Sequence, residues 1–140
     1  SKDTFEHTQN LPQVLDKMYE LLNIGGKVFV GFGPLYNFFN GDHGRTKMYL
    51  PWLHLMFSEK FLIKRLNFKR KDKISKIEDL GLSKYSLKQY KDFFENSKFK
   101  ILFFKTNQTK HPAGKIFNML SKLKFLQEYC TFNIYCVLEK

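Results

Sequence analysis

The sequence has few cysteines and no long apolar run, and each shortage excludes a class of protein. Its 140 residues include two cysteines, Cys130 and Cys136. Two cysteines without paired spacing do not supply the framework of a secreted disulfide scaffold or of a cysteine-based zinc site. Charged or amide side chains interrupt every apolar run before the roughly 18 residues that a membrane-spanning helix needs. We therefore expect reduced thiols and a cytoplasmic location.

Acidic residues are also scarce, and the basic excess is unevenly distributed. The formal net charge is +11, with 24 lysines and arginines against 13 aspartates and glutamates. Residues 1–45 hold 4 basic and 5 acidic side chains, so the excess belongs to residues 46–140. Within Lys64–Lys76, seven cations accompany one anion, Asp72. This segment predicts attraction to nucleic acid or an anionic membrane surface, although a solvated face of a lysine-rich protein has the same composition.

Apolar and aromatic residues are plentiful enough for one folded core. Hydrophobic side chains make up 43% of the chain and aromatic side chains 17%, with 16 phenylalanines among them. This composition excludes a disordered, collagen-like or coiled-coil chain. No repeat or proline-rich linker divides the sequence, so we expect one structural unit over residues 1–140.

Local patterns predict four helices. Asn10, Ser58 and Ser86 have the properties of capping residues, and the helix that follows the first of them covers residues 11–22. Leucines and other apolar residues recur at helical spacing on one face of that segment. A further helix is expected from His111 to Gln127, because the second residue is a proline that suits a first helical turn.

Three apolar segments predict strands, at residues 27–32, 99–105 and 131–138. The first segment lacks polar alternation, which predicts a strand buried on both faces, as in a sheet covered by helices on both sides. Helices and strands alternate along the chain, and this order predicts an α/β fold.

Two loop segments carry the candidate functional residues. In an open parallel sheet, ligands bind at the carboxyl ends of the strands, and both the residues before the first helix and the loop after residue 33 belong to that rim. Their polar and aromatic side chains are Glu6, His7, Asp42, His43, Trp52 and His54. A structural role is equally open for His7, as a hydrogen-bond donor, and for Trp52, as a ring that closes the core. The irregular histidine spacing disfavours a metal site, and nucleophile-elbow, phosphate-loop and complete dinucleotide motifs are absent.

The first of two motifs resembles a signature of the class I S-adenosylmethionine-dependent methyltransferases. Phe5-Glu6-His7 is followed by a leucine-rich helix and then by residues 22–30, which read LNIGGKVFV. This series is similar to the family's LEH, helix, LKPGG, strand pattern. Asn23 and Ile24 stand where that pattern usually has Lys and Pro.

A second motif follows in the order that the family has. The segments GPLY at 33–36, GDH at 41–43 and PWLHLMFSE at 51–59 resemble a bacterial branch of these methyltransferases. The resemblance covers residues 3–59 through motifs and the remainder through the order of elements.

This resemblance implies a Rossmann-like methyltransferase sheet with helices on both faces and a reversed, antiparallel last strand. The three strands of this chain would be the fifth, sixth and seventh, which makes it the C-terminal, acceptor-side half. The implied reaction is methyl transfer from S-adenosylmethionine to a small-molecule, glycan or lipid-linked acceptor. The implied roles are contact with the methyl donor for Glu6 and His7, acceptor binding for Tyr36, Asp42 and Trp52, and acceptor orientation or proton acceptance for His43 and His54.

The chain departs from the family at its start. The family's glycine-rich donor loop and ribose-binding acidic residue precede the matched segment and have no counterpart here. We therefore expect a partial methyltransferase domain over residues 1–140, inactive on its own, and the start at Ser1 rather than Met suggests a cut or processed chain. Such a chain exposes one edge of strand 27–32, which predicts dimerisation through that edge. The alternative is a noncatalytic basic module that binds nucleic acid or anionic lipid through Lys64–Lys76.

Overall fold

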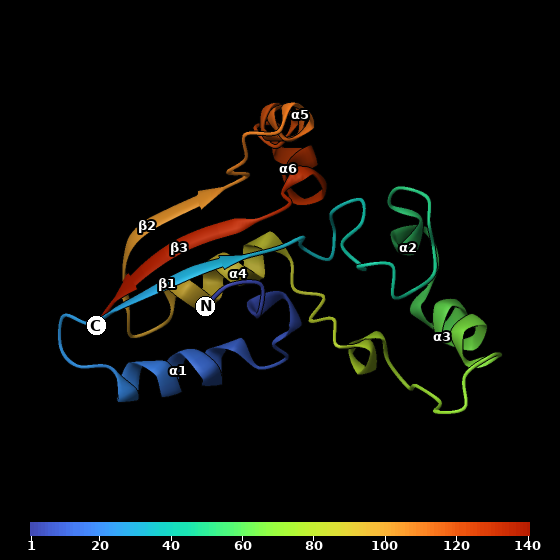
Figure 1. Ribbon diagram of the computed structural model, residues 1–140, viewed down its shortest axis with the longest axis horizontal. Coiled ribbons are helices and arrows are strands. Elements are labelled where there is room, and N and C mark those ends of the chain that lie inside the picture. The colour runs from blue at the N-terminus through green and yellow to red at the C-terminus, as the bar shows by residue number, and fades with distance from the viewer.

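A three-stranded sheet forms the centre of the larger of two lobes (Figure 1). The computed structural model describes residues 1–140, and its strands are β1 (Lys27–Phe32), β2 (Lys100–Thr106) and β3 (Ile134–Glu139). The strand order is β1-β3-β2, and β3 runs antiparallel to both neighbours. β1 and β2 therefore run in the same direction on either side of a reversed final strand. The chain thus combines helices with a β-sheet, as expected, and its last strand is reversed, although both strand pairs are antiparallel.

Two helices cover one face of this sheet. The helices α1 (Leu11–Leu21) and α4 (Leu87–Glu95) lie on the same side of the strands (Figure 1). Burying a large apolar side chain contributes about 1.5–3 kcal/mol, so the side chains between these layers supply much of the stability. The fully buried members of this core, each at most 1% exposed, are Leu11, Leu15, Leu35, Tyr90, Phe94, Ile134, Cys136 and Leu138.

The other face of the sheet is open. Along β1, Val28 and Val30 face the core, whereas Phe29 between them is 66% exposed. Phe29 and Phe103 both lie opposite Val137, and Phe103 is 39% exposed, so the apolar row continues across all three strands. The prediction that β1 is buried on both faces is wrong, because no helix packs against this second face.

The first three residues extend the sheet beyond β1. Lys2 forms a parallel bridge with Gly31. The terminal amino group of Ser1 donates to the Phe29 carbonyl over 2.7 Å, and the Asp3 N–H donates to the Gly31 carbonyl over 2.8 Å. The pairing stops there, and Lys27 at the start of β1 has no strand on its outer side. Residues 1–32 therefore form a strand-like segment, a helix and a strand, with the two extended segments parallel.

The expected helix starts are confirmed by their capping bonds. The Asn10 side chain accepts from the Gln13 N–H at the start of α1. Ser58 caps α3 (Glu59–Asn67) by accepting from the Phe61 N–H. Ser86 forms a reciprocal capping box at the start of α4. These local side-chain acceptors satisfy donors that the first helical turn leaves unpaired.

The single helix expected from His111 to Gln127 is two helices, α5 (Pro112–Leu120) and α6 (Lys124–Cys130). Ser121 lies at the break and is 7% exposed. Its hydroxyl donates to the Asn118 carbonyl and accepts from the Asn107 side-chain amide, each over 3.0 Å. A hydroxyl that bonds to nearby backbone competes with helix continuation, which explains the break.

Asn107 also sets where β3 begins. Its side chain donates to the Cys130 carbonyl over 3.0 Å and accepts from the Phe132 N–H over 2.9 Å. The Thr131 hydroxyl donates back to α6, to the carbonyl of Gln127. Residues 131–133, predicted to begin the strand, therefore form a turn between α6 and β3. The strand starts at Ile134 rather than Thr131.

The smaller lobe consists of α2 (Leu53–Met56), α3 and a 3-10 helix, η2 (Ile77–Leu80). A second core fills it, and its members are Met48, Leu62, Ile77 and Leu82. A further 3-10 helix, η1 (Phe5–His7), precedes α1 in the larger lobe. None of the helices combines the length and the apolar character needed to cross a membrane.

Gly33 should be the most sensitive glycine at the end of β1. Its φ is +155°, and an added Cβ would overlap the Phe132 carbonyl oxygen and lie 3.0 Å from the Asn133 Cα. We expect Gly33→Ala to lower the free energy of unfolding by about 2–4 kcal/mol in urea denaturation. Gly25→Ala is the matched control, because Gly25 also has a positive φ but has nothing within 4 Å of the added Cβ. We expect Gly25→Ala to lower the free energy of unfolding by about 1 kcal/mol. Equal losses for Gly33→Ala and Gly25→Ala would contradict the steric argument.

Candidate functional site

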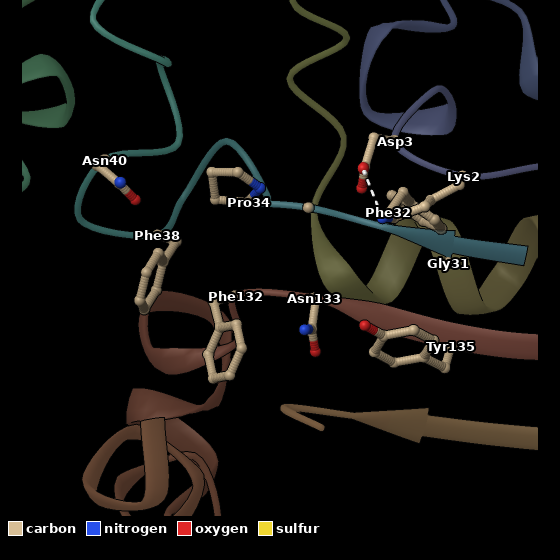
Figure 2. A pocket seen from close by; sticks show the side chains of 11 residues that line it. Lys2, Asp3, Gly31, Phe32, Pro34, Phe38, Asn40, Phe132, Asn133 and Tyr135 are labelled. Carbon is tan, nitrogen blue, oxygen red and sulfur yellow. Dashed lines mark ion pairs between the residues drawn. The ribbon is translucent and has the colours of Figure 1, made fainter. Parts of the chain in front are cut away.

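A crevice of about 360 Å³ opens where β1 ends (Figure 2). It lies at the carboxyl end of β1, the position at which sheets of the α/β class commonly bind ligands. Three segments form its walls: the N-terminus, the turn after β1 and the start of β3. The residues are Lys2, Asp3, Gly31, Phe32, Gly33, Pro34, Phe38, Asn40, Phe132, Asn133 and Tyr135.

Glycine at position 31 gives the crevice an aromatic wall. A Cβ at Gly31 would lie 2.9 Å from the Tyr135 ring, so only glycine lets that ring lie across β1. Figure 2 shows Tyr135 on β3 and Asn133 just before that strand, side by side below the end of β1. Lys2 and Asp3 lie on the other side of β1, with 3.9 Å between their charged atoms. The crevice therefore suits a ligand that combines a flat ring with polar substituents.

Glu6 lies behind the wall of this crevice. Its side chain is 5% exposed, and its Oε2 atom has no hydrogen-bond partner. Burial raises the pKa of the Glu6 carboxyl, while backbone N–H groups, including that of Gly33, oppose the shift. A buried carboxylate without a full set of partners is costly to the fold and is typical of functional positions.

His7 and His43 form a pair beside the same turn. The His7 Nδ1 atom lies 2.7 Å from the Gly81 carbonyl, and the His43 Nε2 atom lies 3.3 Å from the Pro34 carbonyl. Because carbonyls only accept, these two nitrogens carry the protons. The ring centroids are 5.0 Å apart. Partial burial, followed by the charge of His7, lowers the pKa of His43, so its ring is neutral at pH 7 with a free Nδ1 acceptor.

His54 and Tyr36 form a separate pair in the smaller lobe. The His54 ring is 2% exposed, and its Nε2 donates to the Tyr36 carbonyl over 2.8 Å. The two rings meet edge to face at 5.2 Å, and the His54 Nδ1 atom has no partner. Burial, with the nearby charges of Glu59, Asp42 and Glu78, raises the pKa of Tyr36 to about 12. The Tyr36 hydroxyl is therefore a neutral donor at physiological pH.

Asp42 and Trp52 bond to other parts of the chain. Asp42 is 2% exposed and accepts from the Thr46 hydroxyl and from the backbone N–H groups of Gly44 and Thr46. The Trp52 Nε1 atom donates to the Tyr129 carbonyl over 3.3 Å. The Trp52 ring packs edge to face against other rings, those of Phe39 and Phe117.

The residues predicted from the sequence thus fall into several groups, and none of them lines the crevice. Glu6 and His43 come nearest, because the Gly33 N–H is close enough to lower the pKa of Glu6 and His43 bonds to the Pro34 carbonyl. Tyr36 and His54 lie together elsewhere, and Trp52 belongs to an aromatic cluster. At the carboxyl end of β1 the surface of the crevice is made by other side chains.

Sequence reasoning missed the side chains that do line the crevice. Asn133 and Tyr135 lie in the last strand segment, far along the chain from β1. The available signal was the pair of glycines at 31 and 33, since glycine in a strand often marks a close approach by another group.

Two further aromatic side chains, Phe61 and Phe68, lie at the surface of the smaller lobe. They are 46% and 85% exposed and line a groove of about 610 Å³ on the smaller lobe. Helical spacing alone did not show which face of α3 meets solvent.

Comparisons with models of protein families, with curated proteins and with solved structures find no match to this chain. Its histidine, cysteine and acidic side chains form no group of three that could hold a metal ion.

Replacing Glu6 should stabilise the protein at neutral pH. Because the pKa of Glu6 is raised above 4.5 by burial, ionisation of this carboxyl disfavours the folded state. Glu6→Gln removes that charge and should raise the free energy of unfolding at pH 7. The gain should disappear below pH 4.5, where the wild-type carboxyl is protonated in both states. Urea denaturation between pH 4 and 8 measures this difference.

Glu95→Gln is the control for Glu6→Gln, because Glu95 is an exposed residue at the end of α4. Its replacement should change the free energy of unfolding by less than about 0.5 kcal/mol. A Glu6→Gln variant that is less stable than wild type at pH 7 would show that the carboxylate is a favourable buried charge.

His54 should be needed for the fold of the smaller lobe. His54→Phe keeps the aromatic contact but leaves the buried Tyr36 carbonyl without its donor. We expect a loss of about 2 kcal/mol in the free energy of unfolding, measured by thermal or urea denaturation. His54→Gln places an amide donor near the position of Nε2 and should lose less than half as much. Equal losses in the two variants would show that this hydrogen bond contributes little.

Proposed function

We propose that the chain is the acceptor-side half of a class I S-adenosylmethionine-dependent methyltransferase, with a small-molecule, glycan or lipid-linked acceptor. The observation that carries the proposal is the reversed β3 between two strands that run the same way. A reversed last strand is what the sequence resemblance implies, and it occurs in a chain whose residues 3–59 resemble the family's motifs in order.

The N-terminal pairing supports the same proposal. Residues 1–3 run parallel to β1 and lead through η1 and α1 into β1. This crossover brings Asp3 to the crevice wall and Glu6 to the turn behind that wall, at the carboxyl end of β1. Ligands of open α/β sheets bind at such ends.

The crevice fits part of a methyl donor. Its aromatic wall and polar rim, with Asp3, Asn40 and Asn133, suit a ring and an amino group. When bound, S-adenosylmethionine supplies an electrophilic methyl carbon, and its sulfur receives the electron pair of the carbon–sulfur bond as the acceptor attacks. The chain has no glycine-rich donor loop, so we expect weak binding by these residues alone.

The chain's own task would be to position the acceptor and take its proton. Holding the reacting atoms about 3–3.5 Å apart and excluding water accounts for most of such catalysis. His43 is the better placed of the two candidate histidines. Its ring reaches solvent, its lowered pKa keeps it neutral at pH 7, and it bonds to Pro34 at the crevice. His54 is buried against Tyr36 and would position the loop that carries both residues.

Titration with S-adenosylhomocysteine, followed by amide NMR of the 140-residue chain, tests the proposal. We expect saturable, millimolar binding with shifts concentrated at Asp3, Gly31, Gly33 and Tyr135, which surround the crevice. Asn40→Trp should weaken the binding at least about tenfold by filling the crevice. Asn118→Trp, on the exposed face of α5, is the matched control and should leave the affinity unchanged.

Shifts that are absent at ligand concentrations near solubility, or that lie away from these four residues, would overturn the assignment of the crevice to the methyl donor. Equal weakening by Asn40→Trp and Asn118→Trp would do the same.

A further inference from the structure

The groove on the smaller lobe has a cationic rim and exposed aromatic rings. It encloses about 610 Å³ beside α3. Leu66 is its buried floor, at 5% exposure, while Phe61 and Phe68 are 46% and 85% exposed. The remaining lining residues are all cations: Lys47, Lys64, Arg65 and Lys69.

The lysines of this groove have no acidic partner. Lys47, Lys64 and Lys69 form no ion pair within 4.0 Å. The one acidic residue on α3, Glu59, is paired with Lys84 and also accepts from the Ile77 N–H. The positive field over the groove is therefore uncompensated, and it favours an anionic partner.

The arginines of the same segment donate to backbone carbonyls. Arg65 donates to the Thr46 carbonyl over 3.1 Å and to the Lys47 carbonyl over 3.3 Å. Arg70 donates to the Asp72 carbonyl over 3.1 Å. Among the cations that line the groove, those without a hydrogen bond are thus lysines, which act as point charges and lack the planar guanidinium that pairs with base edges or binds a phosphate through two hydrogen bonds. This distribution favours a surface that carries many anionic groups over a nucleic acid recognised by its base sequence.

Exposed apolar side chains continue the groove at its edge. Phe57 is 40% exposed and stacks on Phe61 with 4.8 Å between ring centroids. Met56, next to it in the sequence, is 76% exposed. An aliphatic thioether offers no face for base stacking, but it partitions with phenylalanine into the boundary between lipid headgroups and acyl chains.

We propose that this groove is a docking surface for an anionic membrane. The lysines lie over the headgroups, and Phe61 and Phe68 enter the interface. Exposed apolar side chains beside unpaired lysines are the combination that gives peripheral attachment, because acyl contact and headgroup attraction add. Docking needs neither the crevice nor a methyl donor, so it can be tested independently of methyl transfer.

Vesicle flotation of the 140-residue chain tests the docking surface. We expect binding to phosphatidylcholine vesicles that contain about 30% phosphatidylglycerol and no binding to phosphatidylcholine alone, with affinity falling as salt rises. Lys64→Glu with Lys69→Glu should weaken binding at least about 25-fold, since each cation near the surface contributes about fivefold. Lys100→Glu with Lys105→Glu, on β2, makes the same charge change and should cost less than about threefold.

Phe68→Trp gives a second readout that does not depend on charge. Because Phe68 is 85% exposed, the variant should fold normally, and its added fluorescence should shift to shorter wavelength with anionic vesicles. Failure to bind anionic vesicles at low salt, or equal weakening by the α3 and β2 charge variants, would overturn the proposal. Binding of a single-stranded RNA 20-mer without vesicle binding would also overturn it and assign the groove to nucleic acid.

Discussion

The larger lobe depends on the pairing of β3 with both of its neighbours. β1 and β2 run in the same direction and do not pair with each other, so β3 satisfies the inner backbone groups of both. Its core-facing residues, Ile134, Cys136 and Leu138, are each at most 1% exposed, and they join the two covering helices to the sheet. Both ladders join segments far apart in the chain, which makes the sheet a product of long-range contacts.

One-sided burial explains which surfaces remain available. α1 and α4 occupy one face, so the apolar row through Phe29, Val137 and Phe103 stays open. The short N-terminal pairing occupies only the end of the β1 edge near Gly31. The crevice forms there because the chain leaves the sheet at Gly33 while β3 enters it, and glycine lets the two backbones approach. The candidate site thus depends on two features: the helices cover only one face of the sheet, and β1 and β3 run in opposite directions.

The sequence was sufficient to predict local interactions such as helix caps. It was not sufficient to predict which distant segments of the chain contact each other. The caps at Asn10, Ser58 and Ser86 depend on neighbours three residues away, so their prediction succeeded. The open face of β1 depends on which elements cover the sheet, and the break at Ser121 on a hydroxyl that bonds both to nearby Asn118 and to Asn107 before the helix; both predictions failed. Glu6 and His43 could be proposed as candidates from motif order, but Asn133 and Tyr135 join the crevice only through the antiparallel register.

Hydrogen bonds and an ion pair join the two lobes next to the candidate site. The Glu6 carbonyl accepts from the N–H and hydroxyl of Ser83, and His7 donates to Gly81, just after η2. Lys84 then reaches Glu59 at the start of α3. A surface that held α3 would consequently fix the distance of the crevice from that surface through these bonds. Among the proposed acceptors, a lipid-linked one would gain most from this geometry, because its reactive group would stay at a constant height above the membrane.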